Sequence, residues 1–137
     1  KAIFAGKPIK IFNFGDMSRD FTYIDDVIFA IEKCCYKKST RDLDFNKLKP
    51  NPSTSFCPSR IFNVGKNKPT NLLQFIKILE DNLGKKAIKE YYPLQDGDVI
   101  STSASINKIE EWIDYSPNTS LFDGIKQFIK WYINYYQ

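Results

Sequence analysis

The sequence predicts an α/β protein, because short β-rich runs alternate with amphipathic helical segments along the chain. The hydrophobic fraction is 42% and the aromatic fraction is 15%, which is the composition of a folded domain rather than of a disordered chain. With 137 residues, the chain is long enough for one domain with a modest core.

The first part of the chain predicts two short strands and a helix. Residues 9–14, IKIFNF, alternate between apolar and polar side chains after Pro8 and predict a strand. Residues 21–24, FTYI, predict a second extended run. From Asp25 onward the apolar residues recur with the helical period, so Asp25 and Asp26 are expected in the first turn of a helix, where negative charge complements the helix dipole.

The middle of the chain predicts a long loop, a strand, a helix and another strand. Residues 39–59 contain three prolines and many small polar side chains, so we expect a loop. Residues 60–65, RIFNVG, predict a buried strand that ends at a glycine turn. Residues 70–84 predict an amphipathic helix with Gly84 as its C-cap, and residues 85–93 predict a further strand.

Two helices are expected in the last third of the chain. Residues 105–114 predict a helix with Ser105 as N-cap. Residues 120–137 predict a longer helix, in which Ser120 is the N-cap and Asp123 is the acid of a capping box. The side of the longer helix that is expected to face the core carries Leu121, Ile125, Phe128, Ile129, Tyr132 and Tyr136.

Charge and residue types argue against several kinds of site. The net charge is +4, and residues 1–68 carry 13 basic and 7 acidic side chains, which suits an anionic ligand. The lysines are scattered and form no basic stripe, so we expect no nucleic-acid partner. Histidine is absent, which removes a Ser–His–Asp triad and the usual zinc sites. Neither a G-x-G-x-x-G turn nor a Tyr-x-x-x-Lys pair occurs, so the sequence does not predict a complete oxidoreductase site.

The cysteines and the first residues of the chain indicate the cellular compartment. Cys34, Cys35 and Cys57 are odd in number, and KAIFAGKPIK has no signal-peptide pattern, so we expect free thiols and a cytoplasmic protein. No apolar run approaches the roughly 18 residues of a membrane span, so we expect no membrane partner. Because the first residue is Lys1 rather than Met, we expect a piece of a longer protein, with a processed or trimmed chain as the alternative.

Three short motifs occur in a fixed order: RDFTYIDDV at 19–27, IFNVG at 61–65 and QDGDV at 95–99. Together with GKPIKIFNFGDMSRDFTYIDDV and the closing GIKQFIKWYINYY, they cover nearly the whole chain. This ordered series resembles the C-terminal part of the extended short-chain dehydrogenases/reductases that act on nucleotide sugars. The stretch LGKKAIKEYYPLQDGDV resembles in particular the bacterial UDP-glucuronate 4-epimerase branch.

The resemblance implies that residues 1–137 are the C-terminal, substrate-binding portion of an extended Rossmann-type fold, with few short strands and four to five helices. It implies an NAD-dependent 4-epimerase that interconverts UDP-glucuronate and UDP-galacturonate for surface polysaccharide such as capsule, and that forms a homodimer. NAD and the catalytic residues would belong to an N-terminal domain absent from this chain. The fragment alone would then hold no catalytic residue and would be inactive.

The resemblance also implies which residues hold the UDP moiety. Arg19 would contact the diphosphate, whose oxygens match the planar donor fork of a guanidinium group. Phe12 would lie against the uracil ring, and Lys10 would bring its backbone to the base edge. Asp98 would accept the ribose hydroxyls, and Gln95 would stand at a position near the phosphates.

Val64, beside Asn63, would help to close the base pocket, although plain packing is an equal alternative for both. Arg19 also has a plainer interpretation, because an arginine in this setting commonly pairs with a neighbouring acid such as Asp16 or Asp20. On that interpretation its role would be structural.

Phe12 could equally be a core residue of its strand, and Phe14 competes with it for the role at the base. Asp98 could belong to a solvent-exposed turn. Two departures from the family pattern stand out. Asp96 replaces a proline and adds negative charge near the diphosphate, and Ser105 replaces an aspartate that caps a helix equally well.

Other functions stay open at this point. Another enzyme of the extended family would fit, such as a UDP-galactose 4-epimerase, a UDP-glucuronate decarboxylase or a sugar-nucleotide dehydratase. A non-catalytic nucleotide-sugar-binding module would be an alternative of a different class. The upstream sequence would separate these cases, because only an enzyme needs a glycine-rich turn and a Tyr-x-x-x-Lys pair.

Overall fold

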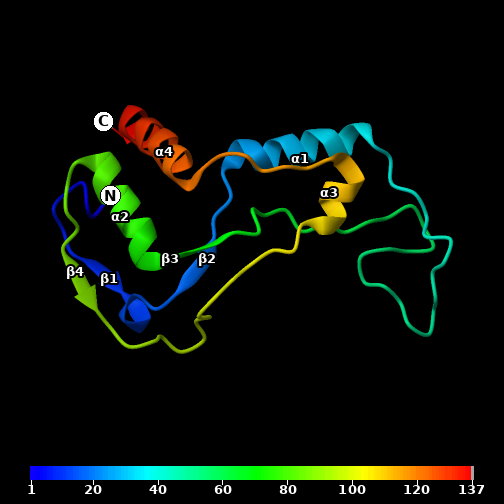
Figure 1. The fold of residues 1–137 in the computed structure, drawn as a ribbon, viewed down its shortest axis with the longest axis horizontal. Helices are drawn as coiled ribbons and strands as arrows, with labels where there is room; N and C mark the ends of the chain where they lie inside the picture. Colours follow the sequence, from blue (N-terminus) through cyan, green and yellow to red (C-terminus); the bar gives the residue numbers. More distant parts are fainter. Residues whose placement is uncertain (137) are drawn as a thin grey trace.

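The computed structural model describes residues 1–136 and has an open, elongated arrangement (Figure 1). Helices α2 (Leu72–Leu83) and α4 (Leu121–Tyr136) pack against each other on one side of the molecule. Helices α1 (Ile24–Tyr36) and α3 (Asn107–Ile113) pack together on the other side. Helices and short strands alternate along the chain, which confirms the predicted α/β class.

The strands form two small sheets of two strands each within residues 1–136. Strand β1 (Ile9–Ile11) pairs in parallel with β4 (Lys89–Tyr91), and β2 (Ser18–Asp20) pairs antiparallel with β3 (Pro69–Asn71). Lys10 lies opposite Glu90 in the first pair, and Arg19 lies opposite Thr70 in the second. These two ladders join the early part of the chain to the segments on either side of α2.

The strand predicted at residues 9–14 is correct only in its first half. It is followed by the 3₁₀ turn η1 (Phe12–Gly15), in which Asn13 and Phe14 have left-handed backbone angles (φ 46° and 50°). Asparagine tolerates this conformation, and here its side-chain amide donates a hydrogen bond of 2.6 Å to the carbonyl oxygen of Asp16. The chain therefore turns where the alternating pattern predicted a straight strand.

Two further strand predictions are wrong. Residues 21–23 belong to no strand, because β2 lies just before them and α1 begins at Ile24. Residues 61–65 also belong to no strand; Arg60 forms an isolated bridge with Thr54, and Ile61 is 65% exposed. A β-rich segment becomes a strand only beside a partner strand, and the part of the chain that is described provides none at 61–65.

The helix predictions for the middle of the chain are confirmed. In α2 the side chain of the N-cap residue Asn71 accepts a hydrogen bond of 2.9 Å from the backbone N–H of Leu73. The helix ends at Gly84, which has the left-handed backbone (φ 63°) that a helix C-cap commonly requires. The predicted strand at 85–93 is confirmed at its centre, in β4.

The caps of the last two helices differ from each other. The predicted cap of α3 by Ser105 is wrong, because the N-cap residue is Ile106, whose side chain cannot accept a hydrogen bond. The carbonyl oxygen of Ser105 instead accepts a hydrogen bond of 3.4 Å from the side-chain amide of Asn63. For α4 the cap by Ser120 is confirmed, because the backbone N–H of Asp123 donates to Ser120 Oγ at 3.0 Å. The Asp123 carboxylate accepts from the Ser120 hydroxyl rather than from its backbone N–H, so the second bond of the predicted capping box is not the one observed. The last residue of the predicted helix, 137, lies outside the described residues.

The core is small and divided. One cluster of fully buried side chains lies between α1 and α3 and consists of Ala30, Ile106, Ile109 and Tyr115. On the other side of the molecule, Ile76 of α2 and Ile125 of α4 are buried. The predicted core-facing stripe of α4 is confirmed in part: Ile125 is buried and Leu121, Ile129 and Tyr132 are partly buried, whereas Phe128 is 51% and Tyr136 is 62% exposed. No helix within residues 1–136 is long and apolar enough to cross a membrane.

Candidate functional site

Arg19 and Asp98 lie together although they are 79 positions apart in the sequence. Arg19 Nη2 donates to Asp98 Oδ1 at 3.0 Å. Arg19 Nη1 donates to the carbonyl oxygens of Ser18 at 2.8 Å and of Ile100 at 3.1 Å. A guanidinium group has about five N–H donors, and these three bonds leave the others without an acceptor in the described residues. The group is thus held in one orientation, with donors available for an anion.

The pairing of β2 brings the two residues together. On the side of β2 opposite β3, Ser18 bridges in parallel to Ser101, and the two hydroxyls share a hydrogen bond of 2.8 Å. Backbone bonds join the N–H of Ser18 to Ile100 at 2.9 Å and the N–H of Thr102 to Ser18 at 3.2 Å. The segment after the QDGDV motif therefore runs along β2, and this places Asp98 beside Arg19.

The QDGDV motif itself is a turn. The backbone N–H of Asp98 donates to the carbonyl oxygen of Gln95 at 3.1 Å, and Gly97 has φ 81°, a conformation that L side chains rarely adopt. Asp98 Oδ1 also accepts from the backbone N–H of Val99 at 3.0 Å. The side chain of Gln95 is exposed, and no hydrogen bond joins it to Arg19 within the described residues.

Phe12 and Lys10 lie against Tyr92, which follows β4. The ring centroids of Phe12 and Tyr92 are 5.9 Å apart, and Lys10 Nζ lies 5.4 Å from the Tyr92 ring centroid. Phe12 is half-buried and Phe14 is 62% exposed. The two rings do not share a strand face, because η1 turns the backbone between them. Sequence reasoning missed Tyr92; the aromatic pair that ends KKAIKEYYP was the available signal.

Tyr92 is also tied to both neighbouring elements. Its backbone N–H donates to Ile11 at 2.8 Å, and its carbonyl oxygen accepts from Phe14 at 3.1 Å. Its hydroxyl donates to Glu90 Oε2 at 3.2 Å, and this hydrogen bond to a carboxylate raises the pKa of Tyr92. The backbone hydrogen bonds of Tyr92 thus place its ring beside Phe12.

Asp20 does not pair with Arg19, which corrects one of the plainer interpretations of the arginine. Its carboxylate accepts three backbone N–H bonds, from Asn67 at 2.9 Å, Lys68 at 3.3 Å and Ala104 at 3.1 Å. The other proposed acid, Asp16, does not pair with Arg19 either within the described residues. Asp20 instead ties the end of β2 to two other segments of the chain.

No hydrogen bond within the described residues joins Val64 to the Arg19–Asp98 pair. Val64 is 36% exposed. The next residue, Gly65, approaches so closely that a Cβ atom there would lie 2.5 Å from Ala104 Cβ and 3.1 Å from Asp20 Oδ2. The carbonyl oxygen of Gly65 accepts a bond of 3.1 Å from the hydroxyl of Tyr115.

Comparison with known proteins gives the class of this chain. No protein-family profile matches it. It is 38% identical over 137 residues to protein CapI of Staphylococcus aureus, covering all of this chain and 41% of CapI. It is 34% identical over 140 residues to a probable UDP-glucuronate 4-epimerase of Rhizobium meliloti, covering 99% of this chain and 40% of the relative. The chain thus spans about two fifths of the length of these relatives.

A solved structure agrees with these relatives. The UDP-glucuronic acid 4-epimerase of Bacillus cereus, in complex with UDP-glucuronic acid and NAD, matches with a TM-score of 0.76 and 27% identity, over 98% of this chain and 39% of that one. In sequence and fold this chain is similar to members of the extended short-chain dehydrogenase/reductase family. Within that family it is similar to the C-terminal portion of the nucleotide-sugar epimerases, as the order of its motifs predicted.

The described residues do not themselves fit a dinucleotide site. The NAD-binding turn of this fold class needs closely spaced glycines between a strand and a helix, whereas Gly6, Gly15, Gly65 and the later glycines are far apart. None of the helices in residues 1–136 begins after such a turn. The cofactor seen in the solved relatives therefore belongs with the part of those enzymes outside this match.

Proposed function

We propose that this chain is the UDP-anchoring C-terminal portion of an NAD-dependent UDP-sugar 4-epimerase that interconverts UDP-glucuronate and UDP-galacturonate. The observation that carries the proposal is the Arg19–Asp98 pair, in which a guanidinium group is held by three hydrogen bonds and keeps free donors. The similarity to a probable UDP-glucuronate 4-epimerase over 99% of the chain supports the branch.

The geometry supports a division of roles within the nucleotide. Arg19 binds the diphosphate, because a charged planar fork suits phosphate oxygens. Asp98 accepts the ribose hydroxyls through Oδ2, which has no hydrogen-bond partner in the described residues, while Oδ1 is held by Arg19 and Val99. Phe12, at the start of η1 and beside the Tyr92 ring, contacts the base. Lys10, the middle residue of β1, brings its backbone to the edge of the base.

Binding the nucleotide firmly serves a reaction that occurs elsewhere on the substrate. Interactions with the UDP moiety provide binding free energy remote from the reacting carbon, and they position the sugar for the chemical step. NAD, bound by the upstream domain, would supply the hydride acceptor for oxidation at C4. On this proposal no residue of this chain is catalytic, and the 137 residues alone do not turn over.

The proposal extends to the setting of the whole enzyme. We place it in the cytoplasm, as a homodimer that forms through the upstream domain, in the supply of sugar nucleotides for surface polysaccharide. The fold alone suits other reactions as well, since a dTDP-glucose 4,6-dehydratase of Bacillus anthracis matches with a TM-score of 0.71 at 19% identity. The sugar and the reaction therefore need a direct test.

The test is an assay of the longer protein, which contains this chain and its upstream domain. UDP-glucuronate is supplied with NAD, and the products are separated by anion-exchange chromatography and identified by proton NMR. The expected product is UDP-galacturonate. UDP-glucose and dTDP-glucose serve as competing substrates; faster turnover of either would contradict the assignment. Release of carbon dioxide or formation of a 4-keto-6-deoxy sugar would indicate a decarboxylase or a dehydratase instead.

A further inference from the structure

Asp20 is the last residue of β2 and directly follows Arg19 in the sequence. It is half-buried, and none of the ion pairs within the described residues includes it. Its negative charge is met instead by the backbone N–H groups of Asn67, Lys68 and Ala104. Hydrogen bonds from backbone N–H groups to a carboxylate are charge-assisted and therefore strong. Asp20 thus fastens two separate segments of the chain to the end of β2.

The segment that ends at Ala104 supplies two of the three acceptors of the Arg19 guanidinium group. These acceptors are the carbonyl oxygen of Ile100, at 3.1 Å, and Asp98 Oδ1, at 3.0 Å. The same segment lies along β2 through an isolated parallel bridge. Its far end is fastened by the bond of 3.1 Å from the N–H of Ala104 to Asp20. Asp20 therefore helps to set where the acceptors of the guanidinium group lie.

The other segment that Asp20 holds turns just before β3. Asn67 has a left-handed backbone (φ 54°), a conformation that is unfavourable for most L residues, and its N–H donates to Asp20 Oδ2 at 2.9 Å. The backbone of Gly65 approaches the same oxygen, since a Cβ atom there would lie 3.1 Å from it. In the pairing of β2 with β3, Thr70 lies opposite Arg19. Asp20 thus also holds the start of the strand on the second side of the arginine.

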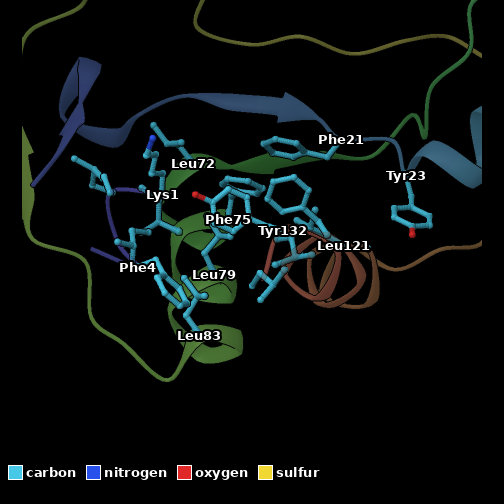
Figure 2. Close-up of a pocket in the computed structure, with 18 of the residues that line it drawn as sticks. Lys1, Phe4, Phe21, Tyr23, Leu72, Phe75, Leu79, Leu83, Leu121 and Tyr132 are labelled. Carbon is cyan, nitrogen blue, oxygen red and sulfur yellow. The ribbon is translucent and has the colours of Figure 1, made fainter. Parts of the chain in front are cut away.

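The end of β2 itself is held by packing rather than by charge. Phe21, the next residue, stacks on Phe75 of α2 with ring centroids 4.3 Å apart (Figure 2). We propose that Asp20 is a positioning residue for nucleotide binding. It holds the segments on both sides of β2 and thereby sets the direction in which Arg19 meets the diphosphate. This inference rests on the proposed function, in which Arg19 binds the diphosphate of the UDP moiety.

Asp26 is the matched control, because it separates positioning of Arg19 from a general effect on folding. It is also half-buried, and it also joins distant parts of the chain. Its carboxylate accepts from the backbone N–H of Thr119 at 3.3 Å and from the Thr119 hydroxyl at 3.1 Å. Neither of these bonds reaches the segments that flank β2. Asp26→Asn should therefore lower the free energy of unfolding and leave nucleotide affinity unchanged.

The experiment measures the Kd for UDP by isothermal titration calorimetry on the longer protein with NAD bound. Asp20→Asn keeps the size of the side chain, but its amide NH2 group cannot accept from a backbone N–H. We expect this variant to raise the Kd for UDP roughly tenfold, because a misdirected group binds its ligand less well. Arg19→Ala should raise the Kd at least as much. The KM for UDP-glucuronate should rise in parallel with the Kd, while the kcat changes little.

A double variant tests whether Asp20 acts through Arg19. Without the guanidinium group there is nothing to direct, so adding Asp20→Asn to Arg19→Ala should raise the Kd no further. An equal fold-increase with and without Arg19 would overturn the inference, as would an unchanged Kd in Asp20→Asn or an equal increase in Asp26→Asn. Circular dichroism establishes that each variant is folded. Asp20→Glu, which keeps both acceptor oxygens, should show a smaller rise of the Kd and serves as the second variant where Asp20→Asn does not fold.

The same samples separate this inference from the proposed function, because UDP contains the diphosphate and no sugar. If the unmodified protein binds UDP but does not turn over UDP-glucuronate, the epimerase assignment fails, and the Kd values of the variants still decide the role of Asp20. Turnover together with a Kd that Asp20→Asn does not change would leave the epimerase assignment in place and would reject the positioning role. Failure of the unmodified protein to bind UDP would reject both.

Discussion

Arg19 Nη2 and Asp98 Oδ1 are 3.0 Å apart, and this contact joins two sequence motifs through the two residues proposed to hold the nucleotide. Both side chains are partly exposed, at 28% and 32%. An ion pair in such a position contributes little to stability, about 1 kcal/mol at most. We therefore expect this ion pair to affect ligand binding more than the free energy of unfolding.

Replacing Arg19 by alanine is expected to weaken substrate binding with little effect on the chemical step. Loss of hydrogen bonds to a charged phosphate costs about 1.5–3 kcal/mol, so the KM for the UDP-sugar should rise roughly 10- to 100-fold. The kcat should change much less, because the diphosphate that Arg19 is proposed to bind takes no part in the reaction at C4 of the sugar. Steady-state kinetics of the longer protein measures both values.

Two variants sharpen this test. Arg19→Lys should recover only part of the affinity, because an ammonium group has no planar fork. Arg41→Ala is the matched control, since Arg41 is exposed in the 39–59 loop, and it should leave the KM unchanged. A KM of Arg19→Ala equal to that of the unmodified enzyme would assign Arg19 a purely structural role.

Gly65 is expected to tolerate no side chain. A Cβ atom at this position would lie 2.5 Å from Ala104 Cβ, and the backbone N–H of Ala104 is one of the three donors to Asp20. Overpacking of this kind costs about 1–3 kcal/mol. Urea unfolding of the longer protein should therefore show that Gly65→Ala lowers the free energy of unfolding by this amount.

A second substitution tests the cause of that loss. In the double variant Gly65→Ala with Ala104→Gly, the clashing methyl group is removed, so part of the stability should return. The single variant Ala104→Gly is measured as well. If the two substitutions lower the free energy of unfolding additively in the double variant, the two sites act independently. The contact between them would then not be the cause of the destabilisation by Gly65→Ala.

Local signals predicted the helices well, because each signal acts within one turn. Gly84 and the Ser120–Asp123 pair are where the pattern placed them, and the structure shows their bonds. The strands were harder, since a strand depends on a distant partner. Residues 61–65 have a β-rich sequence but no partner within the described residues.

The same distinction applies to the candidate site. The sequence motifs indicated Arg19 and Asp98 separately, but nothing in the sequence alone indicated that Asp98 rather than Asp20 would pair with the arginine. That choice depends on the parallel bridge between Ser18 and Ser101. The turn at Phe14 was also not predictable, because its left-handed backbone interrupts an otherwise regular alternation.

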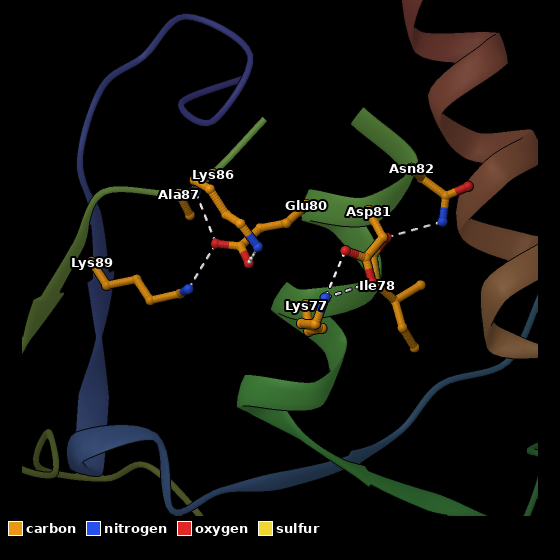
Figure 3. Close-up of polar contacts among 8 residues, drawn as sticks. All are labelled: Lys77, Ile78, Glu80, Asp81, Asn82, Lys86, Ala87 and Lys89. Carbon is orange, nitrogen blue, oxygen red and sulfur yellow. Dashed lines mark hydrogen bonds and ion pairs between the residues drawn. The ribbon is translucent and has the colours of Figure 1, made fainter. Parts of the chain in front are cut away.

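Glu80 provides a test of pH dependence. This residue of α2 is 5% exposed, and its carboxylate accepts from Lys89 Nζ at 2.7 Å and from the backbone N–H of Ala87 at 2.9 Å (Figure 3). Lys86 Nζ lies 3.5 Å from its second oxygen. The hydrogen bond from Lys89, followed by that from Ala87, lowers the pKa of Glu80 from 4.5 to about 2.

The direction of the effect follows from this pKa. Because the folded-state pKa of Glu80 lies below the unfolded value, the stabilisation is fully present above about pH 5 and is lost as the pH falls from 4.5 towards 2. Glu80→Gln should lower the free energy of unfolding by about 2 kcal/mol at pH 7, since bonds to a charged group are lost. The difference between the two proteins should shrink as the pH falls below 4.5 and become small only near pH 2, as measured by urea unfolding between pH 7 and pH 2.

Asp81 is the matched control for Glu80 on the same helix. It pairs with Lys77 at 2.7 Å, but both side chains are largely exposed, at 49% and 61%. Asp81→Asn should therefore cost no more than about 0.5 kcal/mol at pH 7. An equal loss from both substitutions would mean that the burial of Glu80 does not determine its contribution.

The 137-residue chain is expected to be poorly soluble and to lack a sharp thermal transition when it is produced alone. Ile28, Phe29 and Ile31 of α1 are each more than 40% exposed, and an apolar groove between α2 and α4, lined by residues that include Leu79 and Leu121, is open to solvent (Figure 2). Apolar surface of this extent in a protein without its partner domain favours association and weakens cooperative unfolding. Scanning calorimetry should show a cooperative transition for the longer protein and a broad or absent transition for the 137-residue chain alone. In an activity assay, the chain alone should show no turnover of UDP-glucuronate with NAD. A sharp transition of the isolated chain would mean that its small, divided core is sufficient for folding, and measurable turnover would mean that catalytic residues lie within it.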